Sequence, residues 1–318
     1  MGPSFGGSQT RCQRGVALVT ALLVVALGSM LAVSMFHRLQ IQIQRSHNLY
    51  AMSQGFEFSR GLEAWAIVAL QKDLDETGAV DSRQEPWAQG LPAIPVEDGY
   101  LTGQMSDLDG RFNLNNLFVD GSRRGREVAR FRRLLEVLAL DPALSEAVVD
   151  WLDPDTFAGQ GGAEDGEYLR LIPPYRSANR SFVHPSELRL VQGFDQQIFA
   201  TLAPHIATLA VADGPTPVNV NTATPAVLMS LHDDITTELA QSLYKEGRAH
   251  HASVTDFLQQ QQMQNIQFLQ VDPGLSVESR YFLAHGVISI SETVQHFYSI
   301  IEQGRGGFAI IYRSRGVY

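Results

Sequence analysis

Residues 16–36 read VALVTALLVVALGSMLAVSMF, and none of these twenty-one positions carries a charge. A helix of this length spans roughly 30 Å at ~1.5 Å per residue, which is the hydrocarbon thickness of a bilayer. Arg11 and Arg14 precede the stretch in a short polar segment, and the composition after Phe36 is that of a water-soluble protein. The sequence therefore predicts one membrane-spanning helix followed by a folded body.

The composition of the body disfavours several classes of protein. The chain has 318 residues, enough for one to three domains, and its apolar content of 44% is that of a folded protein. Its formal net charge of −10 argues against a nucleic-acid partner. Because Cys12 is the only cysteine and precedes the apolar stretch, the body has no thiol for a disulfide or for thiol catalysis.

Three interpretations of the N-terminus are open. A cleaved secretory signal would have a shorter apolar core and a small-residue cleavage site, whereas Met35-Phe36-His37-Arg38 follows here. A plain signal anchor is the second interpretation, and two arginines on each side of the span leave its orientation undecided. The third is a leader that is cut directly before the apolar segment, which would leave the helix on the mature protein.

The junction of Arg14 and Gly15 with the apolar helix resembles the N-terminus of type IV pilins and type II secretion pseudopilins. This resemblance implies a leader of residues 1–15, which prepilin peptidase cuts after Gly15, and methylation of the new terminal amine of Val16. Most members have glutamate at the fifth mature position, where this chain has Thr20. That departure is typical of the K-type minor pseudopilins of the general secretion pathway, and the resemblance covers essentially the whole chain.

The difference at Thr20 also has a physical interpretation. A carboxylate inside the bilayer is costly unless it is paired, and in a filament it can pair with the terminal ammonium of a neighbouring subunit. A subunit with threonine lacks this contact and is best placed where no subunit lies ahead of it, at the tip. The alternative is that the Thr20 hydroxyl merely bonds back to its own helix.

Helical periodicity continues beyond the apolar stretch. Apolar residues recur at spacings of three and four, and no proline interrupts them, so we expect one helix from near Val16 to about Leu74. Its aromatic side chains Phe56, Phe58 and Trp65 are expected to belong to the protein core. The first half of the helix is expected in the membrane and the second half beneath the body.

Strand patterns predict an α+β fold in which the long helix packs on an antiparallel sheet, which matches the pilin-like fold that the resemblance implies. The proline-containing residues 76–98 are expected to form a loop, and Tyr100–Asp107 a strand. Alternation with period two predicts three further strands after Val277. The expected parts of this framework are the leader (1–15), the transmembrane half of the helix (16–36), its soluble half with the loop and first strand (37–109), and the C-terminal sheet (276–318).

Between these parts we predict a large all-α inserted domain, residues 110–275, built from helix-hairpin-helix (SAM-like) units. An asparagine-rich turn occurs twice, in GRFNLNNLF at 110–118 and in PVNVNTATPAVL at 217–228. In the second copy Thr224 is expected to cap a helix that begins at Pro225, where the missing N–H costs nothing.

The second copy also resembles the helix-hairpin-helix modules of competence DNA receptors, so a DNA-binding minor pilin is the second hypothesis. Such hairpins need a glycine-rich turn that approaches phosphate closely. Residues 231–235, LHDDI, instead carry two carboxylates and no glycine. The six arginines within residues 123–133 are another candidate for nucleic-acid contact, and a solvated helix face is the alternative.

The best candidate for a chemical site is a glycine-rich acidic loop in the insert, within residues 150–168. Its candidate ligands are Asp153, Asp155, Glu164, Asp165 and Glu167. Ca²⁺ takes oxygen ligands in adaptable geometry, although this spacing is not that of an EF-hand. Charge alone leaves open an exposed acidic loop or ion pairs with the three arginines just downstream. The resemblance to K-type pseudopilins, which bind calcium in their inserted domain, favours calcium.

An enzyme has little support in this sequence, because the nine histidines are scattered and no HExxH motif occurs. The resemblance implies a single-pass protein of the bacterial inner membrane with its body in the periplasm, at the tip of the type II secretion pseudopilus. The implied partners are I- and J-type minor pseudopilins, the major pseudopilin and prepilin peptidase, with the secreted protein or the outer-membrane secretin as further contacts, and no nucleic acid. A third hypothesis is a plain membrane-anchored periplasmic binding module without leader processing.

Overall fold

The computed structural model describes residues 13–96, 99–211, 214–264, 266–268, 274–290, 293–316 and 318, with side chains from Val16 onward. It divides into two compact units, residues 1–56 and 57–318. Most of the predicted leader (residues 1–12) therefore lies outside the described residues, as do the side-chain surroundings of Gly15.

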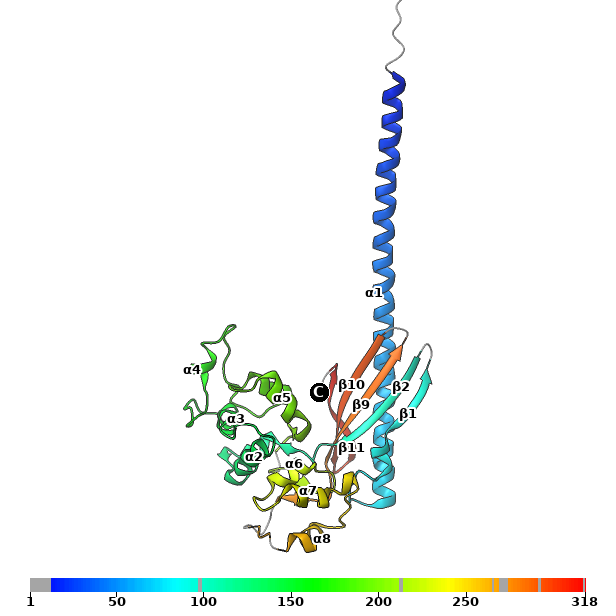
Figure 1. The fold of residues 1–318 in the computed structure, drawn as a ribbon. Helices are drawn as coiled ribbons and strands as arrows, with labels where there is room; N and C mark the ends of the chain where they lie inside the picture. Colours follow the sequence, from blue (N-terminus) through cyan, green and yellow to red (C-terminus); the bar gives the residue numbers. More distant parts are fainter. Residues whose placement is uncertain are drawn as a thin grey trace, which may run out of the picture. The chain divides into compact units, whose positions relative to one another are not determined.

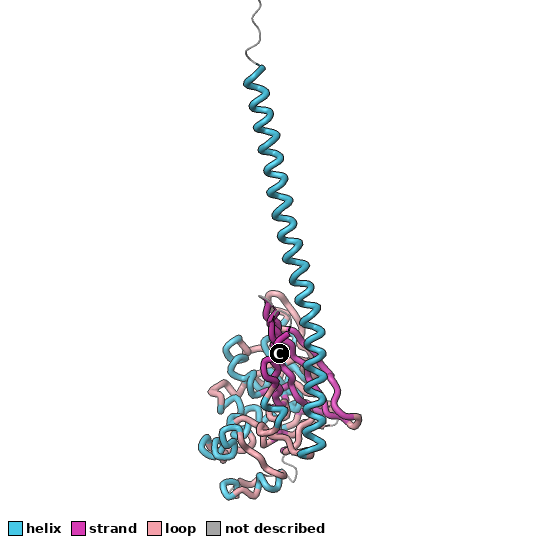
Figure 2. Tube along the Cα trace, turned by 90° about the vertical axis from the view of Figure 1, so that its right-hand side faces the viewer, coloured by secondary structure: helices cyan, strands magenta, loops and turns pink. Residues whose placement is uncertain are grey.

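The described part of the first unit is helical throughout and belongs to helix α1, which is drawn as one unbroken helix in Figure 2. α1 runs from Gln13 to Thr77, which confirms the single long helix expected from the sequence. Every side chain from Val16 to Tyr50 is exposed. Within the described residues, one helix is long and apolar enough to cross a membrane, and its most apolar part is the stretch that begins at Val16.

The second unit contains a five-stranded antiparallel sheet in the order β1-β2-β9-β10-β11 (Figure 1). Its strands are β1 (Leu91–Val96), β2 (Gly99–Asp107), β9 (Tyr281–Ile290), β10 (Thr293–Gly304) and β11 (Gly307–Arg315). β2 pairs with β9 from Gly99↔Ile290 to Asp107↔Phe282. The predicted strand at 100–107 thus joins the three C-terminal strands in one sheet, although the insert separates them in sequence.

The prediction of a loop over residues 76–98 is wrong in part. A 3₁₀ helix, η1 (Pro86–Gln89), and the edge strand β1 both lie within it. Pro92 and Pro95 made β1 look like a loop, because proline cannot donate a hydrogen bond to a strand ladder. An edge strand tolerates them, since only one of its sides is paired.

The sheet packs on the part of α1 that belongs to the second unit. Ala66 and Leu70 are buried in one cluster with Phe282 and Ile301 of the sheet. Leu62 fits over the cross-strand pair Gly103↔Gly286, because a Cβ at either glycine would lie 2.3 Å from a Leu62 methyl carbon. Small residues in the sheet therefore let the helix approach closely.

The aromatic residues expected in the core lie elsewhere. Phe56 is exposed, whereas Phe58 and Trp65 are half-buried, Trp65 packing at the margin of the cluster described above. The prediction that these rings belong to the core is therefore wrong for Phe56 and holds in part for Trp65. The smaller side chains of Leu62, Ala66 and Leu70 face the sheet instead, because bulky rings would hold the helix away from it.

The insert contains short helices around a core of its own. Its α-helices are α2 (Gly125–Val137), α3 (Leu144–Leu152), α4 (Asp165–Tyr168), α5 (Gln196–Leu202), α6 (Pro225–Ser230), α7 (Thr237–Tyr244) and α8 (Val254–Leu258). The 3₁₀ helices are η2 (Leu114–Leu117), η3 (Pro185–Leu190), η4 (Ala203–His205), η5 (Lys245–Gly247) and η6 (Gln261–Met263). Two-residue strands are β3 (Phe112–Asn113), β4 (Phe118–Val119), β5 (Ser122–Arg123), β6 (Ile206–Ala207), β7 (Val218–Asn219) and β8 (Leu275–Ser276).

The two asparagine-rich turns adopt the same structure. Asn115 exchanges two hydrogen bonds with the backbone of Phe182, at 3.0 and 2.8 Å, and Asn221 does the same with His251, at 3.1 and 2.7 Å. Each copy begins at a strand that is closed by a parallel partner, β3 with β6 and β7 with β8. Each half of the insert therefore contains the same asparagine turn and parallel strand pair. The exact domain boundaries at residues 110 and 275 stay a prediction.

Candidate functional site

The acidic loop connects two short helices of the insert. α3 ends immediately before Asp153, and α4 begins immediately after Glu164. Trp151 of α3 and Tyr168 of α4 are both buried, and their ring centroids lie 5.3 Å apart. This aromatic contact brings the two ends of the loop together.

Glycines allow the loop to fold closely over Asp150. The N–H of Gly159 donates to Asp150 Oδ2 at 2.9 Å. A Cβ at Gly162 would lie 1.8 Å from the same oxygen, and Gly161 has a φ of 89°, so neither position accepts an ordinary side chain without rearrangement. The glycine-rich sequence is thus required by the path of the loop.

Three of the five predicted ligands converge. Asp153, Asp155 and Glu164 each offer a carboxylate oxygen, and these oxygens all lie within 4.8 Å of one another. Ca²⁺ holds its oxygen ligands at about 2.3–2.6 Å, so two ligands on opposite sides of one ion are about 5 Å apart. The spacing of the three carboxylates therefore suits a single cation of this kind.

The oxygens of this cluster lack partners of their own. Asp153 Oδ1 and both carboxylate oxygens of Glu164 are buried and accept no hydrogen bond within the described part of the chain. Burial, and then the neighbouring carboxylates, raises the pKa of Asp153 to about 6 and that of Glu164 to about 7. Both observations show carboxylates without a counter-charge, which a bound cation would supply.

A fourth oxygen near the cluster was missed by the sequence reasoning. Asn179 Nδ2 donates to the backbone carbonyl of Asp155 at 2.9 Å, and Asn179 Oδ1 is buried without a partner among the described residues. Amide oxygens are ordinary calcium ligands. Asn179 is separated from the acidic loop by α4 and the following turn, so no local spacing in the sequence pointed to it.

The other two predicted ligands do not join the cluster. Asp165 pairs with Arg176 at 3.2 Å and accepts a hydrogen bond from Ser177 N at 3.0 Å. Glu167 Oε2 accepts from the backbone N–H of Glu164 at 3.1 Å and thereby caps α4. Of the five expected ligands, the structure thus brings three together, whereas Asp165 forms an ion pair as in the alternative interpretation.

The arginines of residues 123–133 are committed to contacts within the chain. Glu146 accepts hydrogen bonds from Arg123, at 2.7 Å, and from Arg132. These bonds, that from Arg123 first, hold the pKa of Glu146 below its ordinary value although burial opposes them. Further ion pairs link Arg124 with Asp120, Arg126 and Arg130 with Glu127, and Arg133 with Asp233. Four carboxylates therefore offset most of the charge of the six arginines, which reduces the attraction of this cluster for phosphate.

At the N-terminal end of α1, Thr20 lies on the exposed apolar stretch. Its Oγ1 donates to the carbonyls of Val16 and Ala17, each at 3.0 Å. The hydroxyl is thus satisfied by its own helix and presents no charge at this position. The many apolar side chains exposed around it would be unfavourable in water, which suggests a single-pass membrane anchor.

Comparison with known proteins links both halves of the insert to one family. Two family models, each described as type II secretion system (T2SS), protein K, match residues 110–211 and 218–278. These ranges coincide with the two similar halves that begin at β3 and β7. The repeated asparagine structure therefore lies within the parts of the chain by which the family is recognised.

Curated relatives extend the similarity to nearly the whole chain. The type II secretion system protein K of Pseudomonas aeruginosa is 32% identical over 93% of this chain and 91% of its own length. The protein of the same name from Aeromonas hydrophila is 31% identical over 95% of this chain and 97% of its own length. Both relatives therefore match nearly the whole chain.

A solved structure shares the fold. A chain in the crystal structure of the GspK–GspI–GspJ complex, from the type 2 secretion system of enterotoxigenic Escherichia coli, matches with a TM-score of 0.77. It is 25% identical in sequence, and the match covers 86% of this chain and all of the other. The mixed α+β architecture of long helix, antiparallel sheet and helical insert is therefore shared with that structure.

Proposed function

Because the chain belongs to the type II secretion system protein K family, we propose that this minor pseudopilin occupies the tip of the periplasmic pseudopilus. There it initiates or caps assembly during the export of folded proteins. α1 anchors the chain in the inner membrane, and the sheet and the insert lie in the periplasm. The role is structural and requires no catalysis by this chain.

The observation that carries the tip position is Thr20. Its hydroxyl is bonded to its own helix, so the residue offers no carboxylate to the terminal ammonium of an adjacent subunit. A subunit without this contact can be followed by others but cannot itself bind one ahead of it by the usual pair. This asymmetry favours the first position of a filament.

The partners follow from the same assignment. The E. coli neighbour is part of a complex named for GspK, GspI and GspJ. We infer that this chain assembles with the corresponding I- and J-type minor pseudopilins, and that the major pseudopilin follows behind them. Prepilin peptidase would release the leader after Gly15, and the insert would face the secreted protein or the outer-membrane secretin.

We further propose that the insert binds calcium through Asp153, Asp155 and Glu164. The support is the convergence of three carboxylate oxygens within 4.8 Å, together with the unpartnered oxygens of Asp153, Glu164 and Asn179. A calcium ion would neutralise the cluster and hold the acidic loop between α3 and α4. Its role would be structural.

The tip position can be tested by electron microscopy. Pseudopili assembled in bacteria that express an epitope-tagged version of this chain should bind gold-labelled antibody at one end only. The major pseudopilin, tagged in the same way, should be labelled along the length. Labelling of this chain along the length would overturn the proposed position.

A further inference from the structure

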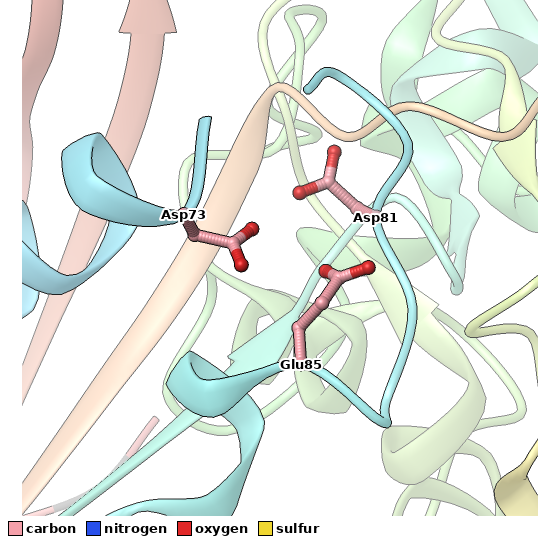
Figure 3. Close-up of side chains that lie close together, drawn as sticks. All are labelled: Asp73, Asp81 and Glu85. Carbon is pink, nitrogen blue, oxygen red and sulfur yellow. The ribbon is translucent and has the colours of Figure 1, made fainter. Parts of the chain in front are cut away.

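A second group of carboxylates lies in the second unit, outside the insert. Asp73, near the C-terminal end of α1, and Asp81 and Glu85, in the segment that follows, each offer an oxygen, and these oxygens all lie within 4.8 Å of one another. All three residues are buried, with relative exposures of 5%, 8% and 7%. Figure 3 shows the three carboxyl groups pointing toward a common centre.

The oxygens of two members are already oriented by hydrogen bonds. Glu85 Oε2 accepts from Ser82 N at 3.0 Å and from Trp87 Nε1 at 2.8 Å. Asp81 Oδ2 accepts from the backbone N–H of Ser279 at 2.7 Å. Carboxylates that ligate a metal are commonly fixed in this way by neighbouring donors, which leave further lone pairs for the ion.

Asp73 supplies the observation that points to a ligand. Its Oδ1 is buried and has no hydrogen-bond partner among the described residues, and the side chain is turned toward the other two carboxylates (Figure 3). An unpartnered carboxylate oxygen facing two more carboxylates is strongly unfavourable unless a positive charge lies between them.

The described residues provide no such charge from a side chain. None of the three carboxylates forms an ion pair with a lysine or arginine in the described ranges. Arg83 lies within the same segment, but its Nε donates to the carbonyl of Thr222 at 3.0 Å and its guanidinium lies over the ring of Tyr244. Burial, followed by the neighbouring acids, raises the pKa of Asp73 to about 6, and burial raises that of Asp81 to about 8.

We propose that Asp73, Asp81 and Glu85 bind a hard divalent cation of the calcium type, at a site separate from the acidic loop of the insert. The ligand set contains only carboxylate oxygens, which suit calcium rather than zinc or copper. The backbone of Asp81 is bonded to the insert and to the segment just after it, since its C=O accepts from Asn219 Nδ2 at 3.1 Å and its N–H donates to Val277 O at 2.9 Å. The ion would thus fasten the end of α1 to the base of the second half of the insert.

The site can be tested on the full-length chain in detergent after treatment with chelator. Terbium chloride, excited through tryptophan, is a suitable probe because Trp87 contacts Glu85 directly. A chain that already carries Asp153→Asn and Glu164→Gln should still give terbium luminescence, which calcium chloride should displace. Adding Asp73→Asn should weaken terbium and calcium binding by about tenfold or more, because one of three anionic ligands is lost.

Asp75→Asn is the matched control, since Asp75 is on the same helix but exposed and bonded to Gln71. It should bind both ions as the parent does.

Thermal unfolding gives an independent readout: Asp73→Asn should raise the melting temperature in chelator, where it removes repulsion, and lower it in calcium. Unchanged ion binding, or an equal rise of the melting temperature in both conditions, would overturn the site in favour of a buried protonated cluster. Neither result depends on the position of the protein in the pseudopilus.

Discussion

Arg313 of β11 donates from Nε and Nη2 to the two carboxylate oxygens of Glu63 on α1, at 2.7 and 2.9 Å. Ser299 of β10 adds a third hydrogen bond to the same carboxylate, at 2.6 Å. The Glu63 side chain is 8% exposed, whereas that of Arg313 is 58% exposed. A buried acid of the helix is therefore held by a mostly hydrated base of the last strand.

This difference in exposure predicts unequal effects of the two single substitutions. Among the described residues, Arg313→Gln leaves the buried carboxylate with Ser299 as its remaining hydrogen-bond partner, and we expect it to lower the free energy of unfolding by about 1–3 kcal/mol. Glu63→Gln leaves an arginine that water already solvates, so its cost should be smaller. Denaturant unfolding of the two variants and of the double variant measures this; equal costs would contradict the argument.

The ion pair of Glu63 and Arg313 also predicts how the free energy of unfolding depends on pH. Burial would raise the pKa of Glu63, but the hydrogen bonds from Arg313 and Ser299 outweigh it and hold that pKa below its ordinary value of 4.5. Because the pKa is depressed in the folded state, the stabilisation is present above the unfolded value and is lost as the pH falls through the folded one. The difference in unfolding free energy between wild type and Arg313→Gln should accordingly shrink below about pH 4.5.

The contact between Leu62 and Gly286 predicts a strong steric effect. A Cβ at Gly286 would lie 2.3 Å from Leu62 Cδ2, so Gly286→Ala must displace the buried Leu62 side chain or the helix that carries it and should cost about 1–3 kcal/mol. Leu62→Ala in the same chain should recover part of this loss, because it removes the clashing methyl group. Gly61→Ala is the control: among the described residues, apart from its own helix, no atom lies within 4 Å of its Cβ position, and helix propensity should make it neutral or stabilising. Strictly additive costs for Leu62→Ala and Gly286→Ala would show that the two sites do not interact.

Calcium binding in the insert predicts that Glu164→Gln shifts the melting temperature in opposite directions with and without calcium. Glu164→Gln removes repulsion in chelator, where it should raise the melting temperature, but it removes a ligand in calcium, where it should lower it. Differential scanning fluorimetry with and without calcium chloride measures both effects. Asp165→Asn is the matched control, because Asp165 pairs with Arg176 outside the cluster and should not alter the response to calcium. A wild-type protein that does not respond to millimolar calcium would refute the site.

Elements with strong local signals could be predicted from the sequence. The uncharged residues 16–36 lie in a single helix, and the alternating pattern after Val277 forms the strands β9 to β11. Thr224 caps α6 as expected, through a hydrogen bond from Val227 N at 3.4 Å. These features depend on residues that are adjacent or a few positions apart, so their physical causes are visible without the fold.

Which carboxylates come together in the two acidic clusters depends on the fold, and the sequence predicts only some of them. Asp165 and Glu167 follow Glu164 closely in sequence, yet α4 begins there and directs them to Arg176 and to the helix N-terminus. Asp73 and Asp81 were not recognised at all, because one is on a helix and the other lies in an apparent loop. Only the tertiary structure shows that buried carboxylates from such different elements converge.

Processing of the leader predicts a defined mature protein. Cleavage after Gly15 followed by methylation should give a membrane-extracted chain whose mass corresponds to residues 16–318 with a methylated Val16. Intact-mass spectrometry of wild type and of Gly15→Leu tests this, since a bulky residue before the cut should leave the precursor intact. A wild-type protein that retains Met1 would identify a plain signal anchor instead.

Introducing a negative charge at position 20 provides the sharpest test of the proposed tip position. Thr20→Glu would give this chain the carboxylate that other subunits carry, so it could pair with the terminal ammonium of a subunit ahead of it. We therefore expect gold label on epitope-tagged Thr20→Glu to move from one end of the pseudopilus to positions along its length, with reduced secretion. Thr20→Gln has the same shape as the glutamate variant without its charge, and its label should stay at the end. If the glutamate and glutamine variants are distributed alike, the missing charge at position 20 does not determine where this subunit assembles.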